Sequence, residues 1–337
     1  MSSAPRGPLP FEAPLAACPA FPLFQFSFTV PERNRLFLPR FPLLGPTSPT
    51  PCNHCTSHPG SHSSFGTALA MPFLLEGSAS MTSSATIQNP ELNEFRSIER
   101  EQARAVQQSL LPLATLLHAK YEIACRYSPL TDVGGDFADY FSLPDGKVGI
   151  YLGDVVGKGL PAAMYGALVM GMLRGIHKTG TDTAAVLALL NKRLLVRPVP
   201  AHYCSTIYAV YDPASRVLTL SNAGLPYPLH ASREAVVTLG QGGVPSGLFP
   251  GSAYDRCTVE LQPGDTVLFA TDGLHEMRNA EREDFSWGQL GKIWRGSRGW
   301  SAEQSLDMLF EELRFFSSGA PRHDDITAVV LKIPESL

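Results

Sequence analysis

The order of predicted strands and helices after residue 120 constrains the fold of this chain more than any other feature. Apolar, strand-like runs occupy residues 121–129, 136–143, 147–154, 204–212, 216–224, 234–240, 265–273 and 326–333. Two helical stretches, 160–177 and 182–195, follow each other directly, and an amphipathic stretch covers 302–316. A doubly wound parallel sheet requires strands and helices to alternate, so this order excludes it. The order predicts instead an α+β fold, a sandwich of mostly antiparallel sheets flanked by helices.

Residues 1–85 differ in composition from the rest of the chain. Fourteen of the chain's 29 prolines occur by Pro72, no lysine precedes Lys120, and Ser, Thr and Gly fill most of the gaps. Because proline removes backbone donors and blocks helices and central strands, this Pro/Ser-rich segment is predicted to be disordered and to form no core. Met71 and Met81 are later candidate start sites, so the alternative interpretation is that the upstream region is not translated.

The same segment contains two patterns that imitate known signals. An uncharged run from residue 13 to residue 30 is interrupted by three prolines, so no membrane-spanning or secretory helix is predicted. The second pattern consists of Cys52, Cys55, His58 and His62. Zinc fingers separate the two pairs by about a dozen residues. Only two residues separate them here, so structural zinc is not expected.

Charge and cysteine usage limit the partners and the compartment. The net charge is −4, and no cluster of Lys and Arg indicates a nucleic-acid partner. Cys125, Cys204 and Cys257 lie in apolar, strand-like runs and are predicted to be buried free thiols in a reducing compartment. We therefore expect a cytoplasmic protein without nucleic-acid or membrane partners.

Residues 86–112 are predicted to form a linker helix ahead of a domain at 113–337. The stretch 91–111 has no glycine or proline, and Pro112 ends it. Its apolar positions form a sparse stripe of Phe95, Ile98, Val106 and Leu110. Because helix nucleation is costly, so thin a stripe does not stabilise an isolated helix. The helix is therefore expected to pack on its own domain or against a second copy of the chain.

The heptapeptide GDVVGKG, Gly153 to Gly159, imitates a phosphate-binding P-loop. A P-loop has four residues between its first glycine and the Gly-Lys pair, followed by Ser or Thr. Only three residues intervene here, and Gly159 has no hydroxyl. The nucleotide-binding interpretation therefore fails, and Asp154 is the residue that needs an explanation.

Asp154 is one of four aspartate positions at which a strand-like run meets a glycine or another aspartate. The others are Asp136, Asp272 and one of the pair Asp324 and Asp325. One such aspartate is usually a turn former, but four in one domain indicate a cluster. Carboxylates gathered at sheet ends repel one another unless cations lie between them, and oxygen-only ligands favour Mg²⁺ or Mn²⁺. Two such ions can hold a hydroxide and a phosphoryl oxygen, so phosphate-ester hydrolysis is predicted.

These motifs, in this order, resemble the metal-dependent Ser/Thr phosphatases of the PPM (protein phosphatase 2C-like) superfamily, and most closely their bacterial SpoIIE/RsbU branch. The resemblance spans about residues 107–333. The motifs that carry it are TDVGGDFADYF, GDVVGKGLPAAM, CSTIYAVYD, LSNAG, GDTVLFATDGLHE and HDDITAVV. It implies an αββα sandwich that holds two Mn²⁺ or Mg²⁺ ions at one end of its two sheets.

The resemblance also implies roles for individual residues. The implied metal ligands are Asp136, Asp154, the Val155 carbonyl, Asp272 and Asp324, with Asp325 as the alternative to Asp324. Asp136, Asp154 and Asp272 are the catalytic set, and Asp154 would bridge the ions. Lys158 is the candidate for contacting substrate phosphate, and a solvated loop lysine is the alternative reading.

Two positions depart from the family pattern. Val156 stands where eukaryotic members carry a histidine proposed as a general acid, so the leaving serine would take its proton from water or from another group. Leu225 stands where the bacterial branch usually has histidine, which weakens any site role for the Ala-Gly-Leu turn.

The implied function is a phosphoserine/phosphothreonine protein phosphatase. Its substrate would be a phosphorylated STAS-type anti-sigma-factor antagonist in a partner-switching pathway. A hydrolase of small phosphate esters and a catalytically inactive phosphoprotein-binding regulator are the alternatives, and the intact aspartate set argues against the second. The linker helices of the branch also suggest a homodimer through the 91–111 helix.

Overall fold

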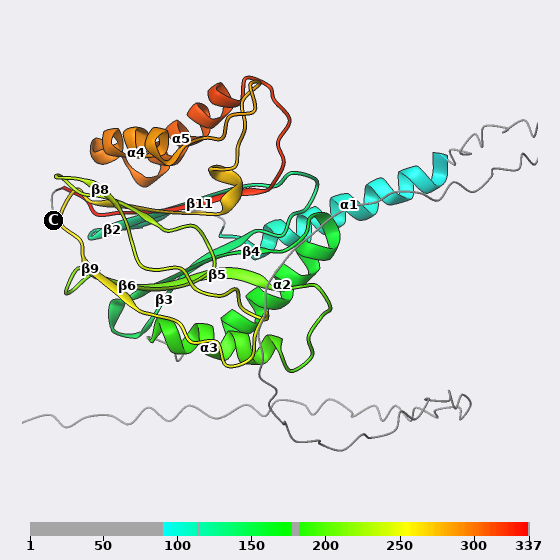
Figure 1. Cartoon of the computed structure of the whole chain (residues 1–337), viewed down its shortest axis with the longest axis horizontal. Helices are drawn as coiled ribbons and strands as arrows, with labels where there is room; N and C mark the ends of the chain where they lie inside the picture. The colour runs from blue at the N-terminus through cyan, green and yellow to red at the C-terminus, as the bar shows by residue number, and fades with distance from the viewer. Residues whose placement is uncertain (1–89, 113–114, 177–181, 336–337) are drawn as a thin grey trace, which may run out of the picture. The chain divides into compact units, whose positions relative to one another are not determined.

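The computed structural model describes residues 90–112, 115–176 and 182–335 (Figure 1). The proline-rich segment, with its Cys/His cluster and its two candidate start sites, lies outside these residues.

The described part contains two antiparallel sheets. The six-stranded sheet A has the order β1 (Leu116–His118), β2 (Tyr121–Ser128), β11 (Ile326–Lys332), β10 (Thr266–Ala270), β7 (Leu229–Ala231) and β8 (Val236–Thr238). The five-stranded sheet B has the order β3 (Phe137–Ser142), β4 (Val148–Val155), β5 (Cys204–Asp212), β6 (Val217–Ala223) and β9 (Cys257–Glu260).

Helices cover the outer face of each sheet. The helices are α1 (Pro90–Leu110), α2 (Gly159–Ile176), α3 (Thr183–Leu194), α4 (Trp287–Gly296) and α5 (Ala302–Ser317). The α2/α3 pair packs on sheet B and the α4/α5 pair on sheet A, with the two sheets between them (Figure 1). The predicted α+β sandwich is therefore confirmed.

The alternation of side chains along each strand creates three apolar layers. In β4, Ile150 and Leu152 face the cluster between the sheets, whereas Tyr151 faces the α2/α3 layer. In β11, Val329 points into the same central cluster and Val330 points toward α4 and α5. Strands covered on both faces need apolar residues at every position, which explains their uninterrupted apolar runs.

Helix α2 has a largely apolar sequence. In the part of the chain that the structure describes, one helix has the length and hydropathy of a membrane span, and it is α2. Its buried residues, among them Val169, Met170 and Leu173, pack on sheet B. The apolar composition of α2 therefore has a structural explanation within the domain.

The hairpin that joins β3 to β4 turns at the sequence Pro-Asp-Gly. A single 3-10 turn covers Pro144–Gly146, in which Asp145 and Gly146 adopt left-handed φ values of 61° and 71°. Aspartate and glycine are the residues that tolerate this conformation best, so the turn chemistry and the observed hairpin agree.

The sequence reading missed four short elements, β1, β7, β9 and α4. The signal for α4 was present, because Ser286 and Gln289 form a capping box at its start. The strands β1 and β7 have only three residues each, too few for a recognisable period. One expectation about thiols was also too broad: Cys204 is buried, but Cys125 and Cys257 are only half-buried.

Candidate active site

The four predicted aspartate positions lie at the ends of four strands. Asp136 directly precedes β3 and Asp154 is the penultimate residue of β4, and these two strands pair with Phe137 opposite Gly153. Asp272 follows β10, and the Asp324–Asp325 pair precedes β11. These two strands pair with Ala270 opposite Ala328. Each sheet thus contributes two adjacent carboxylate-bearing strand ends.

Asp136 joins the two sheets. Its carboxylate oxygen Oδ2 accepts hydrogen bonds from the Thr271 hydroxyl at 2.8 Å and from the Thr327 hydroxyl at 2.7 Å. Thr271 directly follows β10 and Thr327 lies near the start of β11, two central strands of sheet A, whereas Asp136 leads into sheet B. Burial raises the pKa of the Asp136 carboxyl well above its ordinary value, and the nearby negative charge of Asp154 acts in the same direction.

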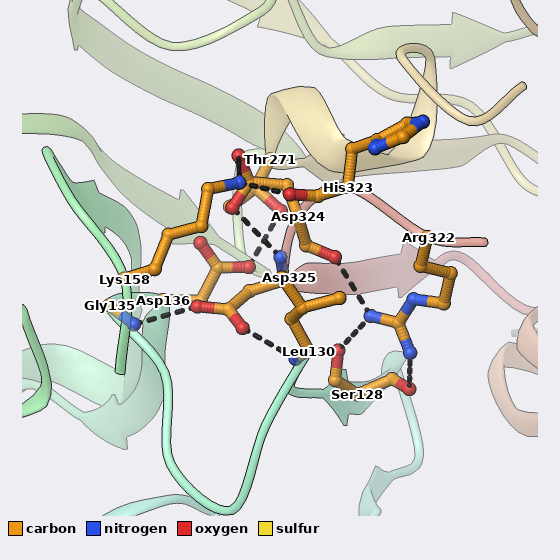
Figure 2. A network of polar contacts seen from close by, with 10 residues as sticks. All are labelled: Ser128, Leu130, Gly135, Asp136, Lys158, Thr271, Arg322, His323, Asp324 and Asp325. Atoms are coloured by element: carbon orange, nitrogen blue, oxygen red, sulfur yellow. Dashed lines mark hydrogen bonds and ion pairs between the residues drawn. The ribbon is translucent and has the colours of Figure 1, made fainter. Parts of the chain in front are cut away.

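Asp325 is turned toward the protein interior. Its Oδ1 accepts the backbone N–H of Leu130 at 2.6 Å, and its Oδ2 accepts the backbone N–H of Gly135 at 2.7 Å (Figure 2). A Cβ added to Gly134 would overlap this carboxylate, so only glycine fits there. Asp325 therefore anchors the loop that carries Asp136.

Asp324 faces the opposite way, toward Lys158. The Lys158 ammonium lies 2.6 Å from Asp324 Oδ2 and also donates to the carbonyl of His323 (Figure 2). The guanidinium of Arg322 holds the backbone of this segment, because it donates to the Asp324 carbonyl at 3.0 Å and to the Ser128 carbonyl at 2.5 Å. The structure thus separates two neighbouring aspartates that the sequence left as alternatives.

Asp154 and Asp272 are both half-buried. Burial raises the pKa of the Asp154 carboxyl to about 7, and the negative charge of Asp272 adds to this effect. Burial also raises the pKa of Asp272, with the charges of Glu276 and Asp324 as further causes. These carboxylates therefore share one acidic environment, in which each penalises the ionised form of its neighbours.

The backbone of the GDVVGKG segment is shaped to approach the same loop. The Val155 carbonyl oxygen would lie 2.8 Å from a Cβ at Gly135. Because Gly135 has no side chain, the two backbone segments can come this close. Gly157 and Gly159 have φ values of 99° and 67°, which let the chain turn from β4 into α2. The predicted carbonyl ligand is thus next to the Asp136 loop.

The donor set fits a hard divalent cation. All of its side chains are carboxylates. Burial, and after it the charges of neighbouring carboxylates, raises the pKa values of three of them, and the Lys158 ammonium already pairs with one. Within residues 90–112, 115–176 and 182–335, no three His, Cys, Asp or Glu side chains already form a ready-made metal-holding group.

Sequence reasoning missed three supporting residues of this site. Thr271, Thr327 and Arg322 hold Asp136 and Asp324 from outside the acidic cluster. The available signal was proximity, since Thr271 immediately precedes Asp272 and Thr327 follows Asp325 by two positions. Nothing in the local pattern indicated that both hydroxyls would reach a carboxylate on the other sheet.

Residues 144–334 match the family described as Stage II sporulation protein E (SpoIIE). The chain belongs to this family. The match includes Asp154, Asp272 and the Asp324–Asp325 pair, whereas Asp136 and its loop precede the matched residues. SpoIIE domains are PP2C-type phosphatase domains, a class that depends on Mg²⁺ or Mn²⁺.

Two curated relatives of this SpoIIE-family chain are each 25% identical to it. One is Protein IcfG of Synechocystis sp., matched over 263 residues that cover 69% of this chain but 41% of IcfG. The other is Phosphoserine phosphatase RsbU of Bacillus subtilis, matched over 240 residues that cover 69% of this chain and 70% of RsbU. The chain thus spans less than half of IcfG and about two thirds of RsbU.

Solved structures show the same fold. The SiaA-PP2C domain of Pseudomonas aeruginosa superposes with a TM-score of 0.65 and 20% sequence identity, over 73% of this chain and 99% of that domain. At this identity the likeness establishes the architecture, and the individual site residues must be argued from their own geometry.

Proposed function

We propose that this protein is a metal-dependent phosphatase of phosphoserine and phosphothreonine in proteins, and that it uses two Mn²⁺ or Mg²⁺ ions. The observation that supports it most is that carboxylates at the strand ends of both sheets lie close together. The hydroxyls of Thr271 and Thr327, from sheet A, hold Asp136, which leads into sheet B. Such a concentration of negative charge is stabilised by divalent cations. Membership of the SpoIIE family supplies the reaction class.

The proposed metal ligands are Asp136, Asp154, the Val155 carbonyl, Asp272 and Asp324. Bound ions would activate a water molecule and polarise the phosphoryl oxygens. Asp136 retains Oδ1 for this purpose, because both threonine hydroxyls bind its Oδ2. Asp325 positions the loop instead of binding metal, because backbone amides engage both of its oxygens.

We propose two roles for Lys158. It pairs with Asp324, and it would be released toward substrate phosphate when a divalent ion takes over that carboxylate. Val156, two positions before Lys158, is apolar and offers no proton. The leaving serine oxygen would therefore be protonated by water.

The proposed substrate is a phosphorylated STAS-type anti-sigma-factor antagonist in a cytoplasmic partner-switching pathway. The likeness to a phosphoserine phosphatase, RsbU, supports the phosphoserine chemistry of this proposal. Residues 113–337 would form the phosphatase domain, and the 91–111 helix would link it to regulatory input.

A substrate panel tests the proposed activity. Purified protein with Mn²⁺ is assayed against a phosphoserine peptide, a phosphotyrosine peptide and a nucleotide, with Asp154→Ala as the matched inactive variant. We expect phosphoserine hydrolysis that needs added metal and is lost in the variant. Equal turnover of the nucleotide would indicate a small-ester hydrolase, and no turnover with any substrate would indicate a phosphoprotein-binding regulator.

We also propose that α1 forms a homodimer. Phe95, Ile98 and Val106 are 56%, 48% and 62% exposed, which leaves most of the apolar stripe uncovered. Sedimentation at micromolar concentration should show a dimer that Val106→Glu dissociates. Gln108→Glu is the control, because it adds the same charge on another face of the helix. A monomeric wild type would overturn the dimer.

A further inference from the structure

The loop that contains Phe249 is fixed firmly to helix α3. Asn191, a buried residue of α3, donates from Nδ2 to the Phe249 carbonyl at 2.9 Å and accepts the Gly247 N–H on Oδ1 at 2.8 Å. The Ser252 hydroxyl donates to the same Phe249 carbonyl at 2.9 Å. A Cβ at Gly247 would lie 3.3 Å from Leu194 of α3, so the loop and the helix are in close contact. The loop backbone is therefore held at several points.

Although its backbone is held in place, this loop leaves apolar side chains in water. Phe249 is 56% exposed and Leu248 is 38% exposed, and Val196, just beyond the end of α3, is 74% exposed. Apolar groups that stay in water contribute nothing to folding through burial. A fixed loop that exposes an aromatic side chain is preorganised for binding, because little conformational entropy is lost when a partner covers it.

The end of α3 adds positive charge beside this loop. Lys192, Arg193 and Arg197 are exposed, and neither 183–203 nor 241–254 contains an acidic residue. Among the residues that the structure describes, none of these three cations pairs with a carboxylate. The helix dipole favours cations in the last turn of α3, but it does not account for apolar side chains exposed next to them. The result is a surface that is both apolar and basic, in a chain whose net charge is −4.

This apolar and basic surface lies at the same end of sheet B as the acidic cluster. Val155, next to Asp154, pairs with Cys204 of β5, and Cys204 exchanges backbone hydrogen bonds of 2.9 and 2.8 Å with Ser246. Neighbouring strands are about 4.8 Å apart, so Ser246 lies about 10 Å from Val155. Phe249 follows three residues later. A protein bound with its phosphoserine at the cluster would cover about 800 Å², a disc of roughly 16 Å radius, which includes this surface.

We propose that this surface docks the phosphoprotein substrate. It consists of Lys192, Val196, Arg197, Leu248 and Phe249, and is called the α3–loop surface. The partner face that fits it is acidic and carries apolar side chains, because the α3–loop surface presents cations around apolar groups. This inference rests on the proposed function, since it states how the same site recognises a protein. The acidic cluster contacts only the phosphoserine, so the α3–loop surface is where one phosphoprotein is distinguished from another.

The test uses two peptides that share a phosphoserine core. In the first, extensions on both sides of the core alternate Glu with Leu and Phe, and in the second they consist of Ser and Gly. Extensions of about six residues span roughly 20 Å, which is enough to connect the acidic cluster with the α3–loop surface. A third substrate, p-nitrophenyl phosphate, is too small to contact that surface and measures the chemistry alone.

The test variant combines Phe249→Ser with Arg197→Glu. Its matched control combines Phe315→Ser with Arg314→Glu, two exposed positions of α5. Phe315 is 82% exposed and α5 covers sheet A, so the control makes the same chemical changes on the other side of the sandwich. A separate variant, Lys192→Glu, leaves the loop unchanged and keeps the test decisive if the Phe249 substitution disturbs the fold.

The wild type should hydrolyse the acidic, apolar peptide with a kcat/KM at least about tenfold above that of the Ser/Gly peptide. In the test variant kcat/KM for the first peptide should fall roughly 10- to 50-fold through KM, the usual effect of losing an aromatic anchor together with a charge. Lys192→Glu should lower it roughly three- to tenfold. Turnover of p-nitrophenyl phosphate and the unfolding temperature should not change, and the α5 control should match the wild type.

Equal kcat/KM values for the two peptides in the wild type would overturn the inference, as would an unchanged preference in the test variant. Two other results would assign the surface to a different occupant and overturn it as well. One is a dimer in sedimentation that the test variant dissociates, and the other is binding to anionic lipid vesicles that the test variant abolishes.

A binding measurement separates this inference from the proposed function. A fluorescent, unphosphorylated form of the acidic, apolar peptide is titrated with metal-free protein, which requires no phosphatase activity. A wild type that binds this peptide, with binding lost in the test variant, but hydrolyses no substrate would remove the proposed activity and retain the docking surface. A wild type that hydrolyses p-nitrophenyl phosphate but does not bind the peptide would remove the docking surface alone.

Discussion

The two ends of the β10–β11 pair differ in whether their buried charges have partners of opposite charge. At one end, His230 Nε2 lies 2.8 Å from Asp265 Oδ2, and the Lys332 ammonium donates to the Gly264 carbonyl at 2.8 Å. At the other end, carboxylates face carboxylates, and the cation that pairs with one of them is the half-exposed Lys158. The strands are the same, so the difference lies in which side chains the two strand ends present.

The contrast separates structural charge from functional charge. A charge buried for stability is normally compensated by partners within the protein, as Asp265 is by His230. At the Asp136 end the compensation is incomplete, and burial together with mutual repulsion raises the pKa values of Asp136 and Asp154. Uncompensated carboxylates at a rigid sheet end lower stability, and a divalent ligand that compensates them explains their presence.

The largest expected effect comes from Asp272→Ala, at the uncompensated end. Phosphatase activity with Mn²⁺ should fall on the order of 10³-fold, because a proposed ligand of the charge-stabilising ion is lost. The metal-free unfolding temperature should stay constant or rise, since one repelling charge is removed. Activity assays and thermal unfolding check both parts. Near-normal activity of the variant, or a metal-free variant that unfolds at a much lower temperature than the wild type, would contradict the proposed difference between the two strand ends.

The next effect is expected from Asp265→Ala, at the compensated end. Removing one member of a buried pair should cost about 3 kcal/mol of unfolding free energy. The kcat of the folded enzyme should stay at the wild-type value. Denaturant unfolding and assays well below the transition measure these quantities, and Asp255→Ala, at an exposed position, is the control. A lower kcat with unchanged stability would contradict the structural role of this end.

A smaller effect concerns pH and Lys332. Burial lowers the pKa of its ammonium to about 8, against 10.5 in the unfolded chain. Between these values the unfolded state binds more protons, so this group makes the protein more stable as pH rises from about 8 toward 10. Unfolding free energies of wild type and Lys332→Met at pH 7.5, 8.5 and 9.5 should therefore diverge in favour of wild type. A constant difference would show that its partners compensate the Lys332 charge fully.

The smallest effect is expected from deletion of residues 1–80. Their composition predicts no apolar core, so neither the unfolding temperature nor the Mn²⁺ concentration for half-maximal activity should change. Both quantities are measured on the truncated and full chains. A fall of several degrees in the unfolding temperature, or stoichiometric zinc released with the segment, would assign it a structural role and revive the Cys52–His62 cluster.

Much of the fold follows from local sequence. The strand predicted at 204–212 is β5, and the helix predicted at 182–195 is α3 with Asp182 as its N-cap. These elements are long and strongly patterned, so apolar period and capping residues suffice to define them. The strand-end aspartates were also recognisable, because each adjoins an apolar run.

The tertiary structure alone decided how those aspartates are used. Asp324 and Asp325 are indistinguishable by local pattern, yet Asp325 binds the amides of Leu130 and Gly135, about 190 positions away in the chain. The same holds for Gln107 of α1, whose carboxamide binds the N–H and the carbonyl of Gly134 and can do so only where α1 lies against that loop. Sequence period reports which face of a strand or helix is buried, and it carries no record of which distant group a polar side chain will meet. Those partners are set only when the two sheets pack together.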